Sequence, residues 1–256
     1  MRENPADRLV PVPAVGRVYG DTRRARLGDV TPDNRLRLDA LARFLQDLSS
    51  DDTVDAAFDN DMAWVVRRTL IEVAQTAVFR EQLDLRTFCS GIGSRWAERR
   101  VSVRGELGAV IEAATLWVHV DLATGRPVPL DEQFHDLFGP TAGGRQVSAR
   151  LTLDAAPAPG ERPDATVMPW PVRFVDLDLL GHVNNAASWA LVEELLATRP
   201  ELAGAPLRAE LEYRDPIEPG AAIEVVAVDG DGQLVMWARD AVTGVTHLAG
   251  RVSSAG

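Results

Sequence analysis

The densest group of side chains able to do chemistry lies in residues 172–189, VRFVDLDLLGHVNNAASW. A carboxylate beside an imidazole can supply a base or a nucleophile together with a group that orients it. Each of these residue types is common in turns, so any two of them carry little information. Five of them fall within residues 176–185, and they include the only histidine of the region: Asp176, Asp178, His182, Asn184 and Asn185. The concentration favours a functional site.

The elements around this group must form a sharp turn between a strand and a helix. Val172–Val175 is predicted to be a short strand, and an apolar stripe from Trp189 to Leu196 predicts a helix. Gly181 permits a sharp turn, and Asn184 or Asn185 is predicted to cap the helix. The free amides and positive end of the helix would then stabilise charge that develops on a carbonyl oxygen. This arrangement predicts acyl transfer or hydrolysis.

The order of strand, turn, helix and antiparallel strands occurs twice. Asp29 precedes Asp176 by 147 residues, and aligning the two places Thr31 at Asp178 and Arg35 at His182. We therefore predict a duplicated unit with one active site per chain; a single α+β domain is the alternative. Strands of the first unit are expected at Arg17–Leu27, Trp64–Val78, Arg95–Arg104 and Ala113–Val120, before and after a helix over Leu38–Leu48. Those of the second unit are expected at Leu207–Tyr213, Ala222–Val228, Leu234–Arg239 and Thr246–Ser253.

Composition excludes several classes of function. The chain has 38 acidic and 27 basic residues, all of the latter arginine, and a net charge of -11, which argues against nucleic acid as a partner. No apolar run approaches the roughly 20 residues of a membrane helix, and residues 1–10 lack the apolar core of a signal peptide. A cytoplasmic protein is expected. One cysteine and four scattered histidines predict no metal site, and no cofactor is expected.

The run DLDLLGHVNN, residues 176–185, resembles the loop-to-helix motif of hotdog-fold thioesterases and is most similar to that of acyl-acyl-carrier-protein thioesterases. Residues 26–43 and 115–126 are similar to other segments of that family, so the resemblance covers nearly the whole chain. It implies an α+β tandem (double) hotdog, in which each unit is a curled antiparallel sheet wrapped around a long helix. We expect a non-catalytic hotdog in residues 1–153, a linker with four prolines in 154–169, and a catalytic hotdog in 170–256.

The resemblance also implies roles for individual residues. Asp178 matches the catalytic Asp of the family, His182 the catalytic His, and Asn184 an asparagine at the helix start. Asp178 would activate water or attack the thioester itself. The family's further Asn falls at Leu180, and its acidic residue after a Tyr-Arg pair falls at Pro216. Residues that could replace the missing acid or assist are Asp215, Glu218, Glu193 and Glu194.

The expected activity is hydrolysis of fatty acyl thioesters, with acyl carrier protein as the partner and the enzyme as a monomer or homodimer. The alternatives are an acyl-CoA thioesterase, a hotdog dehydratase or hydratase, and a non-catalytic acyl-binding protein, which Leu180 and Pro216 favour. An acidic carrier needs a local basic patch, for which the candidates are the arginines at 23, 24, 26, 35, 37, 95, 99, 100 and 104. Cys89 and His119 are expected to be packing residues.

Overall fold

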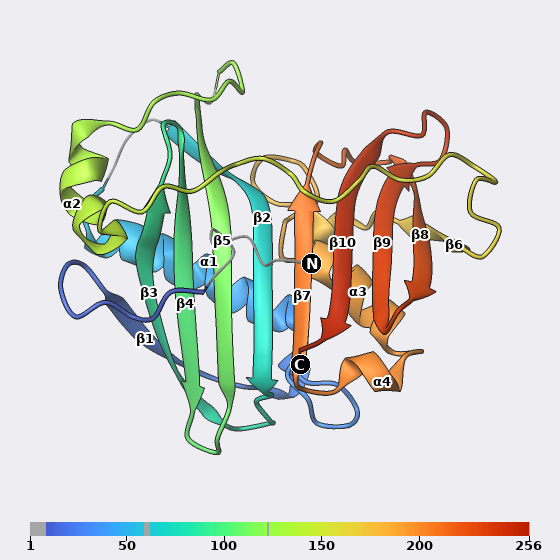
Figure 1. Cartoon of the computed structure of the whole chain (residues 1–256), viewed down its shortest axis with the longest axis horizontal. Coiled ribbons are helices and arrows are strands. Elements are labelled where there is room, and N and C mark those ends of the chain that lie inside the picture. The colour runs from blue at the N-terminus through green and yellow to red at the C-terminus, as the bar shows by residue number, and fades with distance from the viewer. Residues whose placement is uncertain (1–8, 59–61, 122, 256) are drawn as a thin grey trace.

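The computed structural model describes residues 9–58, 62–121 and 123–255. Ten antiparallel strands form one sheet in this part of the chain, with α1 and α3 on one of its faces (Figure 1). The strands are β1 (Tyr19–Arg24), β2 (Met62–Gln75), β3 (Gln82–Ile92), β4 (Trp96–Gly105), β5 (Val110–Asp121), β6 (Thr166–Pro171), β7 (Leu207–Tyr213), β8 (Ala222–Gly230), β9 (Gln233–Asp240) and β10 (Thr246–Ser254). The helices are α1 (Leu38–Asp55), α2 (Glu132–Ala142), α3 (Ser188–Leu196) and α4 (Pro200–Ala203).

The strand order shows that the two halves of the sheet have the same connections. It runs β1-β3-β4-β5-β2-β7-β10-β9-β8-β6, so adding five to each strand number of the first half gives the second half in reverse order. The halves join where β2 pairs with β7, from Arg68 opposite Glu212 to Val73 opposite Leu207. This is the α+β double hotdog that the sequence predicts, and in it the two repeats share one continuous sheet.

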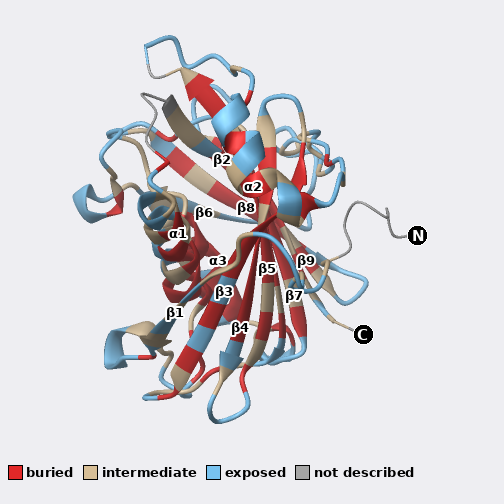
Figure 2. Ribbon diagram, turned by 90° about the vertical axis from the view of Figure 1, so that its left-hand side faces the viewer, coloured by how far each residue is buried: buried red, intermediate tan, exposed pale blue. Residues whose placement is uncertain are grey.

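Each half buries the apolar stripe of one helix against its strands. Leu41, Leu45 and Leu48 of α1 are buried, and the residues 147 positions later, Ser188, Val192 and Leu195, are buried on α3. The two helices also contact each other. Buried residues accordingly concentrate where the sheet faces the helices (Figure 2). Since each fully buried leucine contributes about 1.5–3 kcal/mol, these stripes fix the helices in the concave side of the sheet.

The loop before each helix has the same backbone hydrogen bonds in both halves. In the first half the N–H of Thr31 donates to the carbonyl of Arg35 at 2.8 Å; in the second the N–H of Asp178 donates to the carbonyl of His182 at 2.9 Å. Two further pairs keep the spacing of 147: Arg37 N–H to Asp29 O with Asn184 N–H to Asp176 O, and Asn34 N–H to Thr31 O with Gly181 N–H to Asp178 O. The alignment made from sequence therefore describes real structural equivalence.

Four elements differ from expectation. The sequence does not predict β3, α2 or the short helix α4, and the strand expected at Val172–Val175 lies earlier, as β6. A 3-10 turn, Phe174–Asp176, occupies the end of the expected strand. Thr166–Pro169 of β6 fall in the segment expected to be a linker. Two prolines are tolerated in β6 because it is an edge strand, where no outer neighbour needs their missing N–H groups.

The chain between α2 and β6 crosses the face of the sheet opposite to the helices (Figure 1). The buried carboxylate of Glu212 accepts from the N–H groups of Thr152, at 2.6 Å, and Leu153, at 3.1 Å. The indole of Trp237 donates to the carbonyl of Asp154 at 3.0 Å. The start of the expected linker is thus held against the sheet.

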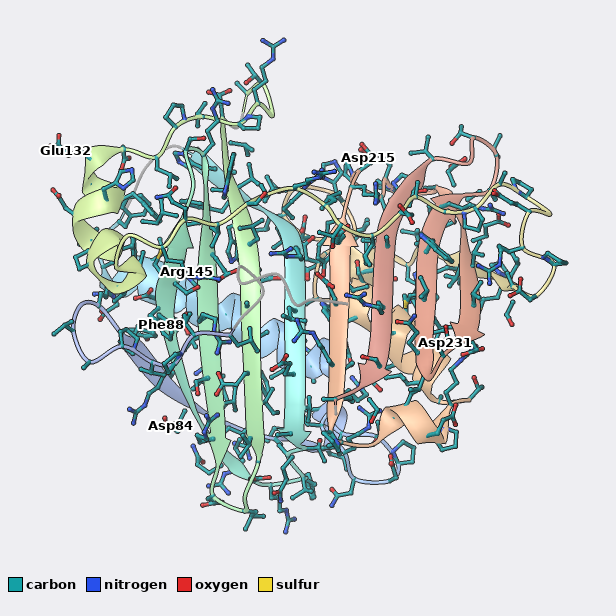
Figure 3. All side chains as sticks on the ribbon, viewed as in Figure 1. Asp84, Phe88, Glu132, Arg145, Asp215 and Asp231 are labelled. Atoms are coloured by element: carbon teal, nitrogen blue, oxygen red, sulfur yellow. The ribbon has the colours of Figure 1, made fainter. Side chains whose placement is uncertain are left out.

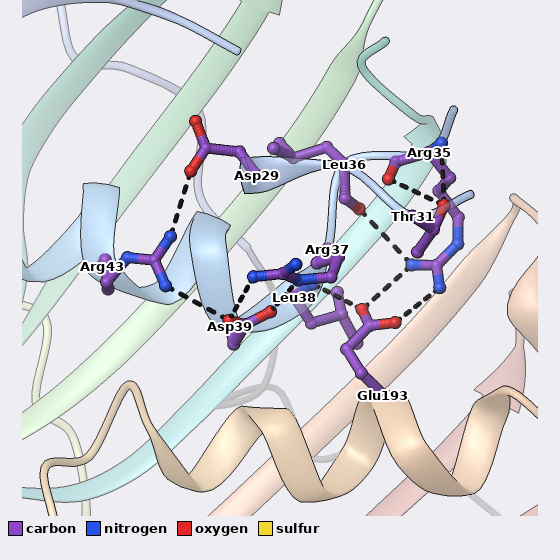
Figure 4. A network of polar contacts seen from close by, with 9 residues as sticks. All are labelled: Asp29, Thr31, Arg35, Leu36, Arg37, Leu38, Asp39, Arg43 and Glu193. Atoms are coloured by element: carbon purple, nitrogen blue, oxygen red, sulfur yellow. Dashed lines mark hydrogen bonds and ion pairs between the residues drawn. The ribbon is translucent and has the colours of Figure 1, made fainter. Parts of the chain in front are cut away.

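The two halves also meet in a buried ion pair (Figure 4). The guanidinium of Arg35 contacts both carboxylate oxygens of Glu193, at 3.0 and 2.6 Å. Glu193, on α3, also accepts from the N–H of Leu38, the first residue of α1, at 2.5 Å. α1 has no side-chain cap of its own. Glu193 therefore caps a helix of the other half, and its carboxylate is bound there and not at the predicted catalytic loop.

Replacing Glu193 with alanine should destabilise the protein, because Arg35 would remain buried without its counter-ion. We expect the free energy of unfolding, measured in urea, to fall by about 3–5 kcal/mol. The double variant Arg35→Met/Glu193→Leu should recover part of this loss, because it removes both charges. Asp164→Ala, which breaks the exposed pair with Arg162, is the matched control and should change stability little. Equal effects of Glu193→Ala and Asp164→Ala would contradict a structural role for the buried pair.

Candidate active site

A cavity of about 730 Å³ lies between the loop before α3 and the ends of β2 and β5. Asp178, Leu180 and His182 line it on the loop side, and Val65 and Val118 line it on the strand side. Asp215, just after β7, lies at the same rim of the sheet (Figure 3). The structure therefore brings Asp178 and His182, two of the residues predicted to be catalytic, to one cavity.

The loop is shaped by Asp178 and Gly181. The Asp178 carboxylate accepts from the N–H of Leu180 at 2.9 Å, and the Asp178 carbonyl accepts from the N–H of Gly181 at 3.0 Å. Gly181 has a φ of +78°, in the left-handed region that glycine adopts without strain. These bonds turn the chain so that His182 follows Asp178 on the cavity wall, with both side chains half-buried.

Among the acids considered from sequence, Glu218 is the one in contact with the imidazole. Its Oε1 lies 3.1 Å from Nε2 of His182. Asp215 lines the cavity, but no side-chain contact joins it to His182 within the described residues. Glu193 is bound to Arg35, and Glu194 is exposed on α3. Sequence spacing alone does not distinguish Asp215 from Glu218, because it does not show which side chain turns toward the histidine.

Asn184 and Asn185 have different surroundings. The Asn184 side chain accepts from the N–H of Ala186 at 2.8 Å, so it caps the turn that precedes α3. The prediction that an asparagine caps α3 itself is wrong, because the helix begins at Ser188 and its N-cap residue is Ala187. Asn185 lines the cavity and Asn184 does not. The Asn185 carbonyl accepts from the buried hydroxyl of Tyr213 at 3.0 Å, and burial raises the pKa of that hydroxyl, so it remains a donor.

Asp176 anchors the entry to the loop. Burial alone would raise the pKa of its carboxyl, but the side chain and the N–H of Arg173 both donate to it, and the net pKa lies below the ordinary value. Its carbonyl accepts from Asn184. Asp176 therefore supports the loop as a carboxylate and lies outside the cavity.

Three arginines line the cavity: Arg67, Arg95 and Arg214. Burial and the neighbouring Arg214 lower the pKa of Arg67, which donates to the carbonyls of Tyr213 and Arg214. Arg95 is exposed at the rim. Most of the other arginines considered for a basic patch are held in ion pairs: Arg23, Arg35, Arg37, Arg99, Arg100 and Arg104. Only Arg95 of the arginines predicted for docking lines the cavity.

Comparison with known proteins identifies the family. Residues 16–138 match the acyl-ACP thioesterase N-terminal domain, and residues 161–247 match the acyl-ACP thioesterase C-terminal domain. The chain belongs to the acyl-ACP thioesterase family. It is a thioester hydrolase that acts on fatty acyl thioesters, in agreement with the prediction from sequence.

Individual relatives of this thioesterase span nearly the same length. An uncharacterized protein of Mycobacterium tuberculosis is 33% identical over 218 residues, which are 85% of each chain. The 12:0-ACP thioesterase from Umbellularia californica has a TM-score of 0.75 at 20% identity and covers 92% of this chain and 96% of its own. An acyl-ACP thioesterase from Bacteroides thetaiotaomicron has a TM-score of 0.72 at 16% identity, covering 92% and 97%. The two structures show that the thioesterase shares their fold.

A second cavity, of about 300 Å³, lies in the first half between α1, α2 and the sheet. Cys89 lines it, and burial raises the pKa of the thiol to about 11. His119 is also buried. Its ring packs against Trp64 with centroids 4.8 Å apart and planes tilted by 36°, and its Nδ1 lies 3.1 Å from the carbonyl oxygen of Pro129. Both residues lie in the core, as the sequence predicts.

Neither a metal cluster nor a membrane-spanning helix is found in the described ranges. No three His, Cys, Asp or Glu side chains among residues 9–58, 62–121 and 123–255 are grouped to hold a metal ion. No helix in that part of the thioesterase combines the length and apolar character needed to cross a membrane.

The thiol of Cys89 should be almost unreactive in the folded enzyme. With a pKa of about 11, roughly one thiol in a thousand is ionised at pH 8, and the thiolate is the reactive form. We expect a charged aromatic disulfide reagent to react at least about 100-fold more slowly with the native enzyme than with the same enzyme in urea. Rapid reaction of the native enzyme would show an accessible thiolate.

The depressed pKa of Asp176 should make part of the stability depend on pH. A carboxyl whose pKa is lower in the folded state stabilises that state above its unfolded pKa, near 4, and loses this contribution as pH falls through the folded pKa. The difference in unfolding free energy between wild type and Asp176→Asn should therefore be largest above about pH 5 and shrink toward pH 2. Urea unfolding at a series of pH values measures it, and a difference that grows as pH falls would contradict the assignment.

Proposed function

We propose that Asp178 and His182 are the hydrolytic centre of this thioesterase and that its substrate is a fatty acyl thioester of acyl carrier protein. The observation that carries the proposal is the shared cavity of Asp178 and His182, with Glu218 in contact with the imidazole. A carboxylate, an imidazole and a second carboxylate that orients it are the groups that thioester hydrolysis needs.

In one form of the reaction Asp178 takes a proton from water while the water oxygen bonds to the thioester carbonyl carbon. The C–S bond then breaks, the fatty acid is released, and the departing thiolate takes up the proton that Asp178 removed from water, which restores the carboxylate. In the other form the Asp178 carboxylate attacks the carbonyl carbon, the C–S bond breaks and the thiolate leaves. Water then hydrolyses the mixed anhydride, which releases the fatty acid and regenerates the Asp178 carboxylate, and the thiolate takes up a proton released by that water. Glu218 holds His182 through Nε2 in both forms. Single-turnover hydrolysis in labelled water separates them, because only the second form places isotope in Asp178.

Asn184 contributes to catalysis by positioning other groups. Its side chain is occupied by Ala186 N–H, and its own N–H is bound to Asp176. These bonds set the turn that leads from the reactive loop to Asn185. The backbone N–H of Asn185 makes no hydrogen bond within the described residues, and we assign it to the carbonyl oxygen of the substrate, where charge develops during attack.

The acyl chain is accommodated by a line of cavities from the second half into the first. The catalytic cavity shares Val66, Asn185 and Tyr213 with a small cavity of about 20 Å³ between α1, α3 and the sheet. The small cavity shares Gln46 and Trp117 with the 300 Å³ cavity. Aromatic side chains surround the far end: Phe58, Trp64, Phe134 and Phe138. If the acyl chain is buried among these aromatic side chains, the thioester at its other end lies beside Asn185.

The arginines at the outer cavity favour an anionic carrier. Arg67, Arg95 and Arg214 line the same cavity as Asp178. The arm of acyl carrier protein bears a phosphate, and the protein is acidic, so both are attracted to guanidinium groups. Coenzyme A carries phosphates too, which makes an acyl-CoA the second candidate substrate.

The Asp178→Asn variant should lose activity while keeping its fold. We expect kcat to fall by about 10²–10⁴, the usual contribution of a positioned base, with an unchanged circular dichroism spectrum. Acyl-carrier-protein and acyl-CoA substrates of matched chain length should both be assayed, and the carrier-protein series should have the higher kcat/KM. Glu194→Gln, a change on the exposed side of α3, is the control and should behave as wild type. Turnover that survives in Asp178→Asn would place the reaction elsewhere.

A further inference from the structure

In the first half, the position equivalent to the proposed oxyanion site is occupied by a side chain of the protein itself. The carboxylate of Glu193 lies on the N–H of Leu38, the first residue of α1, at 2.5 Å, and Arg35 binds both of its oxygens (Figure 4). A negatively charged oxygen thus rests on a backbone amide at the start of a helix. An oxyanion formed from a thioester would have the same charge and the same kind of donor.

The repeat maps this arrangement onto the catalytic half. A shift of 147 residues carries Arg35 to His182, Leu38 to Asn185, and Gln46 to Glu193. The backbone bonds of the two loops keep this spacing, and so do the buried stripes of the two helices, so the equivalence extends along α1 and α3. Gln46 therefore occupies the same position relative to the second-half loop that Glu193 occupies relative to the first-half loop.

The position of Gln46 agrees with this equivalence. It lines the 20 Å³ cavity together with Asn185 and Tyr213. Its side chain is half-buried and makes no hydrogen bond to any residue that the structure describes. The N–H of Asn185 is equally without a partner there, whereas its counterpart on Leu38 is bound to Glu193. Two unused polar groups thus border the same small cavity beside the proposed reaction centre.

We infer that the side-chain amide of Gln46 binds the thioester carbonyl oxygen together with the N–H of Asn185. This inference rests on the proposed function of Asp178 and His182. The amide NH₂ group donates a hydrogen bond to the oxygen, and this hydrogen bond becomes stronger as negative charge develops on the oxygen. A glutamate at the same position would bring its own negative oxygen to the Asn185 amide, as Glu193 does at Leu38, and would repel the oxyanion. Glutamine at position 46 therefore leaves the second-half loop open to bind the substrate oxygen, whereas glutamate at position 193 occupies the first-half loop.

The test compares Gln46→Met, Gln46→Ala and Gln46→Glu, with Asp47→Asn on the exposed side of the same helix as the control. Removing one donor from an oxyanion site lowers kcat by about 10²–10³, so we expect that loss in Gln46→Met and Gln46→Ala with KM changed by less than about threefold. Gln46→Glu should lose at least as much. Asp47→Asn should match wild type.

Thermal unfolding of each variant separates binding from packing. A purely structural role would lower the melting temperature and leave kcat of the folded enzyme unchanged, and it would overturn the inference. Wild-type kcat in Gln46→Met would overturn it as well, because methionine retains the size but not the donor. Asp178→Asn is measured alongside. If it is inactive while Gln46→Met is fully active, only the role of Gln46 fails; if it remains active, the proposed function itself fails.

Discussion

Pairing between β2 and β7 is the constraint on which the rest of the molecule depends. It joins two five-stranded halves into one sheet and places α1 and α3 side by side on the same face. The first residue of α1 reaches the middle of α3, where Glu193 accepts from the N–H of Leu38. Asn185, just before α3, lines the same small cavity as Gln46 of α1. The loop with Asp178 and His182 therefore belongs to one half, and the cavity that it lines is completed by β2 and β5 of the other half.

The two loops show how the same backbone can serve different purposes. Their hydrogen bonds coincide, and both use a residue with positive φ at the same place, Asn34 in one and Gly181 in the other. The side chains decide the outcome. Arg35 attracts a carboxylate into the first loop, whereas His182 leaves the second open to a cavity. Burying an ion pair is costly unless the geometry is good, and here the pair also caps α1.

Much of this could be predicted from local patterns. The apolar stripes of both helices, the hairpins of the second half and the loop with Asp178 and His182 follow from periodicity, turn residues and family resemblance. β3 has a detectable signal at its start, where Asp84 and Arg86 alternate with leucines as in a half-buried strand, but its later residues are buried on both faces and lose the alternation. α2 contains Gly139 and Pro140, which indicate a turn, and β6 contains prolines that an edge strand tolerates.

Contacts between distant residues lie beyond such patterns. Glu193 and Arg35 are 158 positions apart, and only the packing of the halves brings them together. From sequence, Glu193 is a candidate to assist catalysis; in the fold it is paired with Arg35 and caps α1. The contact of Glu218 with His182 likewise depends on how the chain after β7 turns back toward the loop.

The covalent union of the repeats has a consequence for how such an enzyme can diverge. In a symmetric dimer of one hotdog, a single codon specifies both copies of every position. A substitution that places a charged side chain in one loop therefore places it in the symmetry-related loop as well. Here positions 46 and 193 are encoded separately, as are 35 and 182. One half can therefore exchange reactivity for stability, and can reshape its cavity by mutation, while the inherited chemistry of the other half is left untouched.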